Sequence, residues 1–256
     1  MALLWVVALV AGFVDSIAGG GGLLCLPALL LAGFDPVAAL ATNKVQGSFG
    51  TASATLAFTR KGHLDLLANW QSVATTFAGA CLGVLAVQVA PVRLLSGLLP
   101  VLLIAMALYF ALSPRLSNAD AHPRLPFAFF IAGFAPVIGF YDGIFGPGTG
   151  SFFMLALVTL FGFGIVRATA TTKLLNLTSN LAAVIMFTFT GKIVWSVGLM
   201  MGVGQFIGAQ AGSHLAMARG VAVIRPLLVV VCCALTVKLL ADPANPIHQW
   251  LASMLR

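Results

Sequence analysis

Long apolar runs separated by short polar or glycine-rich interruptions make up most of the chain. A helix that crosses a bilayer needs about 20 consecutive, mainly apolar residues, and several of the runs reach that length. We therefore expect an all-α, multi-pass (polytopic) membrane protein. The predicted helical segments cover residues 2–14, 23–33, 37–59, 66–90, 94–112, 125–141, 151–162, 165–189, 193–217 and 221–241.

Two of these segments, 23–33 and 151–162, are too short to cross a bilayer, and each follows a glycine-rich break. The first break is the run of glycines at 19–22, and the second is Gly-Pro-Gly-Thr-Gly-Ser at 146–151. Each glycine costs a helix about 1 kcal/mol relative to alanine, so a helix is expected to stop at each break. Interrupted pairs of this kind form half-helices that meet inside the membrane.

One polar stretch, 113–123, divides the chain near its middle and is interpreted as a linker. The expected organisation is a first transmembrane repeat at 1–112, a polar cytoplasmic linker at 113–124, a second transmembrane repeat at 125–241 and a C-terminal tail at 242–256. Each repeat is expected to hold one glycine-broken helix pair and three long transmembrane helices.

The two halves resemble each other in sequence. Gly12–Gly22 aligns with Gly139–Thr149 at an offset of 127 residues (139 minus 12), and Ala41–Lys44 aligns with Ala170–Lys173 at an offset of 129 (170 minus 41). Matches between aspartates and between lysines are informative, because the chain has few of either. The pattern indicates an internal repeat.

The repeat is either inverted or parallel. If each half crosses the membrane three or five times, the second half is inverted relative to the first. If the broken pair acts as one kinked span, each half crosses four times and the repeat is parallel. The positive-inside rule favours inversion, with the central linker in the cytoplasm and both termini outside. Inversion places Arg60, Lys61, Arg115, Arg124, Arg167, Arg219 and Arg225 on one side, against Arg93, Lys192, Lys238 and Arg256.

Composition supports a membrane protein and excludes several other classes. Hydrophobic residues make up 61% of the 256 residues and charged residues 7%, against about 25% charged in soluble domains. The net charge of +7 is spread along the chain with no basic stripe, so a nucleic-acid partner is not expected. The cysteines and histidines show no ligand spacing, so no metal is expected. The first apolar segment has no basic residues before it and is expected to be retained rather than cleaved as a signal peptide.

Two lysines lie in an unusual environment. Lys44 and its repeat mate Lys173 each lie several residues inside a long apolar segment. A lysine at the centre of a membrane helix costs about 2.5 to 3.5 kcal/mol, so two at equivalent positions suggest a shared, inward-facing role. The alternative is that each side chain reaches the lipid headgroups from near a helix end.

The glycine breaks are candidates for substrate binding. Glycine lets bare backbone approach a ligand, and the short helix after each break begins with unpaired N–H groups at its positive end. Two such ends meeting at the membrane midplane would form an anion site, although close helix packing also uses small residues. The candidate substrate-binding residues are Gly19, Gly20, Gly21, Gly22, Gly146, Gly148, Thr149, Gly150, Lys44, Lys173 and the nearby polar residues Thr42, Asn43, Gln46, Thr171, Thr172 and Asn176.

Asp15 and Asp142 lie just before the two breaks. They are interpreted either as structural groups, capping a helix or pairing with the buried lysines, or as titrating groups that couple proton or sodium movement to transport. No catalytic constellation of serine or cysteine with histidine is visible, so no enzyme activity is expected.

These motifs resemble those of the TauE/SafE (sulfite exporter) family of membrane permeases. The resemblance rests on Val14–Gly22, Pro27 and Ala41–Lys44, together with their counterparts at 146–150 and 170–173, and it extends from Gly12 to about residue 240. It implies a multi-pass bacterial inner-membrane transporter of sulfur-containing anions such as sulfite, sulfoacetate, sulfolactate or aryl sulfonates, with no cofactor. The sequence departs from internal symmetry at Asn43 against Thr172, so the two half-sites need not bind identically.

The motifs and the resemblance converge on an alternating-access carrier with one central anion site. Two other classes remain open, a small-anion channel and a membrane assembly factor or intramembrane enzyme without transport. The glycines at 79–83 and 208–212 are compatible with a homodimer interface, and equally with packing inside one chain.

Overall fold

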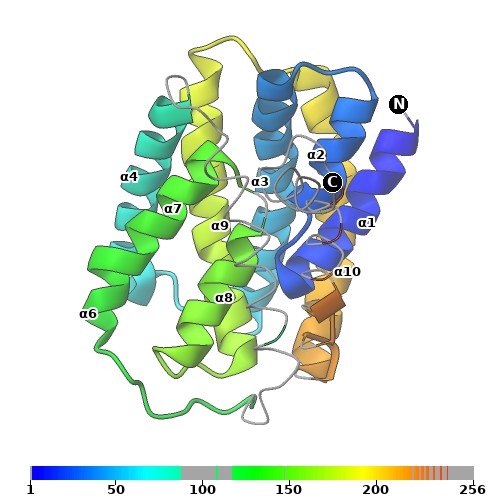
Figure 1. The fold of residues 1–256 in the computed structure, drawn as a ribbon. Coiled ribbons are helices and arrows are strands. Elements are labelled where there is room, and N and C mark those ends of the chain that lie inside the picture. Colours follow the sequence, from blue (N-terminus) through cyan, green and yellow to red (C-terminus); the bar gives the residue numbers. More distant parts are fainter. Residues whose placement is uncertain are drawn as a thin grey trace, which may run out of the picture.

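The computed structural model describes residues 2–87, 117–146 and 148–220, with isolated residues at 108 and within 222–241. The predicted segment at 94–112, the start of the linker, most of 221–241 and the tail at 242–256 lie outside the described residues, as does Pro147. The described part of the chain consists of helices and the loops that join them (Figure 1). The prediction of an all-α protein is confirmed.

Each half begins with a helix, a break and a short helix. In the first half α1 (Ala2–Ala18) is followed by α2 (Gly22–Leu31), and in the second half α7 (Ala135–Ile144) is followed by α8 (Thr149–Thr159). At 10 and 11 residues, α2 and α8 are about 15 to 17 Å long at 1.5 Å per residue, which is half of a bilayer's hydrocarbon thickness. The helix before α7 continues from α6 (Phe127–Phe129) through a π-helical stretch, η2 (Phe130–Phe134).

Two long helices follow each short one. They are α3 (Pro36–Arg60) and α4 (Trp70–Val87) in the first half, with the 3-10 turn η1 (Leu67–Asn69) before α4, and α9 (Ile165–Thr188) and α10 (Trp195–Arg219) in the second. Asp35 caps α3 by accepting the N–H groups of Val37 and Ala38, and Pro36 occupies the first helical position.

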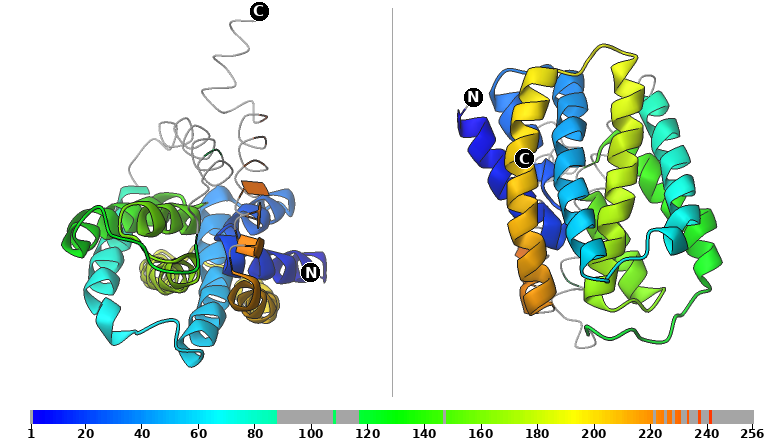
Figure 2. Two further views of the ribbon diagram at one scale, coloured as in Figure 1. Left: turned by 90° about the horizontal axis from the view of Figure 1, so that it is seen from below. Right: turned by 180° about the vertical axis from the view of Figure 1, so that it is seen from behind.

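The helices form two layers. Helices α10, α3, α9 and α4 lie side by side in one layer, as the right-hand view of Figure 2 shows. On the other side of this layer α1 packs along α10, and α7 packs along α4. In Figure 1, α1 runs downward from the top of the molecule and α2 runs back up to it. In the second half, α6 and α7 run upward from the bottom and α8 runs back down to it.

Glycines allow the closest helix contacts. A Cβ atom at Gly79 of α4 would lie 2.1 Å from the carbonyl oxygen of Pro136, and one at Gly208 of α10 would lie 1.9 Å from that of Leu9. The glycines one turn later in both helices are equally close to their neighbours. These small-residue faces are therefore occupied by packing within one chain, and a second copy would have to use another surface.

Two of the described helical stretches, Leu67–Val87 and Phe127–Ile144, are long and apolar enough to cross a membrane by length and composition. Helices α3, α9 and α10 are as long, but polar side chains lower their mean hydropathy. Many of these polar side chains are buried against neighbouring helices, including Gln46, Ser53, Asn176 and Gln205.

The described part of the linker is hydrogen-bonded to the loop between α8 and α9. Asp120 accepts the N–H of Gly164 at 2.7 Å and forms an ion pair with Arg167, whose guanidinium lies 4.0 Å from the centre of the Phe163 ring. Partial burial raises the pKa of Asp120, but the hydrogen bonds from Gly164 and Arg167 outweigh it, and the pKa is lowered overall.

We predict that Asp120→Asn destabilises the protein by up to about 1 kcal/mol at neutral pH, because the ion pair is exposed to solvent. A folded-state pKa below the unfolded value of about 3.9 means that the stabilisation is present above that pH and is lost as the pH falls through the folded pKa. The thermal stabilities of wild type and variant should therefore converge in acid. A constant difference across this range would show that the Asp120 charge does not contribute.

Candidate functional site

The two glycine breaks touch each other at the centre of the molecule. Gly19, which follows the last residue of α1, has a φ of +76° and lies against Gly150 in the first turn of α8. A Cβ atom on Gly19 would be 2.6 Å from the Gly150 Cα. Gly146, the repeat mate of Gly19, also has a positive φ of +86°. The first turns of α2 and α8 therefore approach one region.

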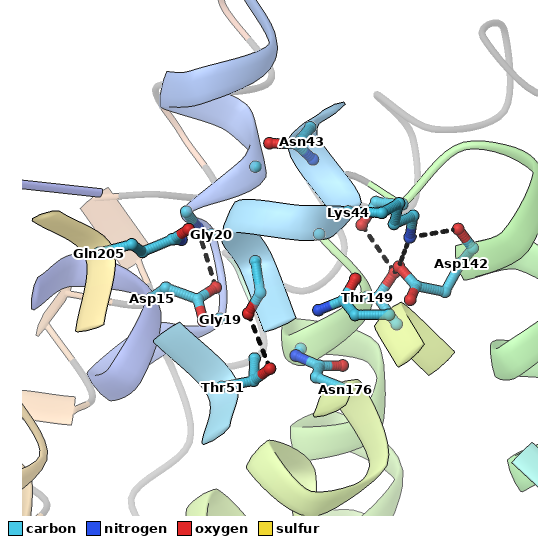
Figure 3. Close-up of a pocket in the computed structure, with 17 residues that line it drawn as sticks. Asp15, Gly19, Gly20, Asn43, Lys44, Thr51, Asp142, Thr149, Asn176 and Gln205 are labelled. Atoms are coloured by element: carbon cyan, nitrogen blue, oxygen red, sulfur yellow. Dashed lines mark hydrogen bonds and ion pairs between the residues drawn. The ribbon is translucent and has the colours of Figure 1, made fainter. Parts of the chain in front are cut away.

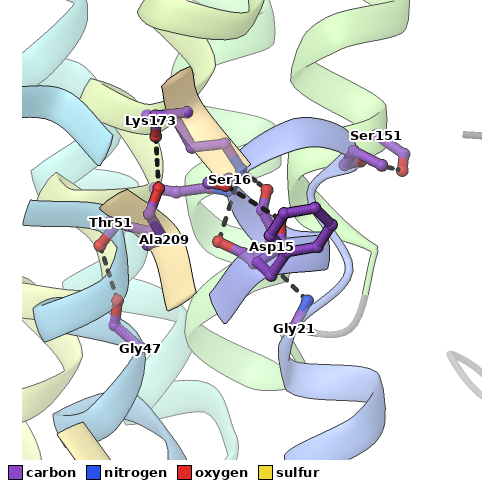
Figure 4. A network of polar contacts seen from close by, with 12 residues as sticks. Asp15, Ser16, Gly21, Gly47, Thr51, Ser151, Lys173 and Ala209 are labelled. Atoms are coloured by element: carbon purple, nitrogen blue, oxygen red, sulfur yellow. Dashed lines mark hydrogen bonds and ion pairs between the residues drawn. The ribbon is translucent and has the colours of Figure 1, made fainter. Parts of the chain in front are cut away.

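Each buried lysine pairs with the aspartate of the opposite half. The Nζ of Lys44 on α3 lies 2.9 Å from Oδ1 of Asp142 on α7 and donates to the Asp142 carbonyl oxygen at 2.6 Å (Figure 3). The Nζ of Lys173 on α9 lies 3.4 Å from Oδ2 of Asp15 on α1 and also donates to the Asp15 carbonyl oxygen (Figure 4). Both lysines are fully buried, so neither side chain reaches the headgroup region.

The aspartates also organise the breaks. Oδ1 of Asp15 accepts the N–H of Gly21 at 2.9 Å, and Oδ1 of Asp142 accepts the hydroxyl of Thr149 at 2.7 Å. Each carboxylate therefore links a buried lysine of the other half to the first turn of its own short helix. The sequence suggested that these aspartates could pair with the buried lysines, and in the structure both do so.

A cavity of about 40 Å³ lies between the breaks (Figure 3). Its wall carries backbone from both breaks, one lysine, both aspartates, and amide and hydroxyl side chains. The lining residues are Asp15, Gly19, Gly20, Gly21, Gly22, Asn43, Lys44, Gly47, Thr51, Asp142, Gly146, Gly148, Thr149, Gly150, Asn176, Asn180 and Gln205.

Some residues predicted for the site are not on this wall. Lys173 is buried against Asp15, and Thr42 accepts the backbone N–H of Val194 at 3.1 Å. Gln46 donates to the side chain of Asn43 at 2.6 Å and so supports a wall residue from behind. Thr171 and Thr172 are buried without lining the cavity.

Four wall residues were not among the predictions, namely Gly47, Thr51, Asn180 and Gln205. Thr51 and Asn180 lie seven residues after Lys44 and Lys173, two helical turns along the same face, so the repeat and the helical period could have identified both. Gln205 is a polar residue in an apolar stretch of α10, and its sequence context carries no comparable signal.

Gln205 is held by glycines. Cβ atoms at Gly12, Gly21 and Gly50 would each lie within 3 Å of its backbone or side chain. These glycines come from α1, the first break and α3, so the carboxamide is clamped where three elements meet. A carboxamide offers both an N–H₂ donor and a carbonyl acceptor to whatever occupies the cavity.

Comparison with known proteins gives a consistent answer. The model of the family described as Sulfite exporter TauE/SafE matches residues 4–239. A probable membrane transporter protein, ORF9, of Sinorhizobium sp is 53% identical over 252 residues, covering 98% of this chain and 96% of its own. The probable membrane transporter protein YfcA of Escherichia coli is 46% identical over 255 residues (98% and 94%), and one from Haemophilus influenzae is 43% identical over 242 residues (94% and 95%). No solved structure gives a significant match.

Proposed function

Because the chain belongs to the sulfite exporter TauE/SafE family, which is a family of membrane transporters and not of enzymes, we propose that it carries a small sulfur-containing anion, such as sulfite or a sulfonate, across the membrane. One observation carries this proposal: both glycine breaks and the buried Lys44 face the same cavity. The anion occupies this cavity during transport.

The donors around the cavity suit an oxyanion. The first N–H groups of a helix have no partner within the helix, and the helix dipole is positive at that end. The N–H of Gly21 already donates to Asp15, and those of Thr149 and Ser151 donate to carbonyls of the second break. Gly22 and Gly150 lie on the wall beside them, and Lys44 adds a positive charge. Asn43, Asn176 and Asn180 can turn amide N–H groups toward sulfonate oxygens and so replace the hydration that the anion loses.

The size of the cavity favours a compact substrate. A cavity needs about 10 to 15 Å³ to hold one water molecule, so 40 Å³ corresponds to a few waters. Sulfite or the head group of a sulfonate is of this size, whereas an aromatic ring is not. The cavity therefore supports sulfite and small sulfonates over aryl sulfonates in this conformation.

We further propose that the two halves are an inverted repeat that moves by alternating access. The helix before the first break runs from the top in Figure 1, and the helix before the second break runs from the bottom. Contacts recur between equivalent helices, since α1 with α10 matches α7 with α4, and α3 with α10 matches α9 with α4. Rocking one half against the other would expose the central cavity to each side in turn.

The distribution of charge supports a multi-pass location in a bacterial inner membrane. Arg60 ends α3, Arg124 precedes α6, Arg167 lies in the first turn of α9 and Arg219 ends α10. In Figure 1, α3 and α10 end at the bottom and α6 and α9 begin there, whereas the loop from α9 to α10, which contains Lys192, crosses the top. By the positive-inside rule the bottom end is cytoplasmic.

Thermal stability of the purified protein against a panel of anions tests the proposal. A ligand at 100 times its dissociation constant stabilises the folded state by about 2.7 kcal/mol. We expect stabilisation by sulfite or small sulfonates, and a smaller effect from sulfate, phosphate, acetate and toluenesulfonate. Stabilisation by none of these anions, or equal stabilisation by all, would contradict a specific anion site.

A further inference from the structure

The charges around the cavity cancel before any substrate enters. Lys44 pairs with Asp142 and Lys173 pairs with Asp15, so the four charged groups sum to zero. If the cavity binds an anion, as proposed above, the complex acquires an uncompensated negative charge in a buried site. A buried charge without compensation is strongly unfavourable, so the site needs one more positive charge for each monoanion.

The carboxylates of Asp15 and Asp142 differ in their capacity to bind the proton that would supply this positive charge. Both oxygens of Asp15 are engaged, Oδ1 with the N–H of Gly21 and Oδ2 with Lys173. Asp142 uses Oδ1 for both Lys44 and Thr149, and its Oδ2 is buried and accepts no hydrogen bond from the described residues. Oδ2 of Asp142 is thus a buried acceptor on the cavity wall that is still free to bind a proton.

We propose that Asp142 binds one proton at Oδ2 for each monoanion that enters, so that the protein is a proton-coupled symporter. The new O–H bond neutralises the carboxylate, and Lys44 is released from its ion pair to the anion. The sum over the four groups and the anion returns to zero. When the anion leaves, the proton leaves Oδ2 on the same side and the Lys44–Asp142 pair re-forms.

The surroundings of Asp142 favour a proton over a sodium ion. Lys44 approaches Asp142 from α3, so a metal ion at the carboxylate would lie next to an ammonium group. The other helices packed on α7 bring few ionisable groups, since α8 and η2 carry none and α4 carries Cys81. On α9 Lys173 is paired with Asp15 and Arg167 with Asp120, and Tyr141 neighbours Asp142 on α7 itself.

The test is the number of protons moved per anion in proteoliposomes, with a pH-sensitive dye inside. Methanesulfonate is the main probe, because it does not titrate near neutral pH and any proton that moves with it was bound by the protein. We expect one proton per methanesulfonate, and about tenfold accumulation for each unit of inside-alkaline pH gradient. Uptake without proton movement, or uptake that follows a sodium gradient, would overturn the proposal.

Two matched variants locate the proton. In Asp142→Asn, anion exchange should persist at some rate while net uptake carries no proton and ignores the pH gradient. In the double variant Asp15→Asn with Lys173→Met, which removes the other ion pair and keeps the charge sum at zero, each anion should still carry one proton, whatever the rate. Loss of proton coupling in this double variant with retention in Asp142→Asn would contradict the assignment.

A measurement on the wild-type protein guards against misfolded variants. Calorimetric titration of methanesulfonate in two buffers of different ionisation enthalpy counts the protons bound with the anion, and one is expected. Binding with no proton uptake would overturn the coupling but leave the anion site standing. Failure of both methanesulfonate and sulfite to bind or cross the membrane would instead contradict the proposed function itself.

Discussion

Lys44→Ala is expected to reduce anion uptake to the level of protein-free liposomes while the protein remains in the membrane. Lys44 is the lysine that lines the cavity, and its ammonium is the positive charge that the anion would meet. The same change leaves the buried carboxylate of Asp142 without its partner, which costs about 3 to 5 kcal/mol of stability. Uptake of radiolabelled sulfite and thermal unfolding of the purified variant measure the two effects.

The double variant Lys44→Ala with Asp142→Ala separates them. Removing both members of a buried ion pair is far less destabilising than removing one, so the double variant should recover most of the lost stability. Uptake should stay at background, because the positive charge is still missing. Recovery of both stability and uptake would mean that the pair is structural and that Lys44 does not bind the substrate.

Gly19→Ala is expected to abolish uptake and to lower stability by several kcal/mol. Gly19 has a φ of +76°, a conformation that costs other residues about 1 to 2 kcal/mol. Its new methyl group would also lie 2.6 Å from the Gly150 Cα, so the two breaks would have to separate. Thermal unfolding and uptake of sulfite in proteoliposomes measure both losses.

Gly62→Ala is the matched control for this substitution. Gly62 has nearly the same backbone conformation, with a φ of +74°, but a Cβ atom there meets nothing within 4 Å. It should show the conformational cost alone and keep normal uptake. If the two variants behaved alike, contact between the breaks would not be important for the site.

The breaks and the short helices could be predicted from the sequence because glycine runs end helices by local physics. The gap between 19–22 and the next polar residues leaves room for a helix of about ten residues, and α2 has that length. The same reasoning placed α8 after the second break, where Gly148 has a φ of +81° and precedes the helix. Backbone conformation at these positions depends on the residues themselves.

Which lysine pairs with which aspartate could not be predicted in the same way. Two lysines and two aspartates allow pairing within each half or between the halves, and the sequence does not distinguish them. The decision depends on how α3 packs beside α9, which brings Lys44 to Asp142 and Lys173 to Asp15. Gln205 reaches the cavity wall because α10 packs on α1 and α3, which is likewise a matter of tertiary packing.

Counterflow of radiolabelled sulfite tests the central claim, that the two breaks and Lys44 form the site of a carrier. Proteoliposomes with the purified protein are loaded with unlabelled sulfite, or left empty, and exposed to a low concentration of label. We predict saturable uptake that is faster and transiently accumulates in loaded vesicles, and that Lys44→Ala removes. Uptake that does not saturate and is indifferent to loading would indicate a channel, and no uptake of any sulfur-containing anion would contradict the account.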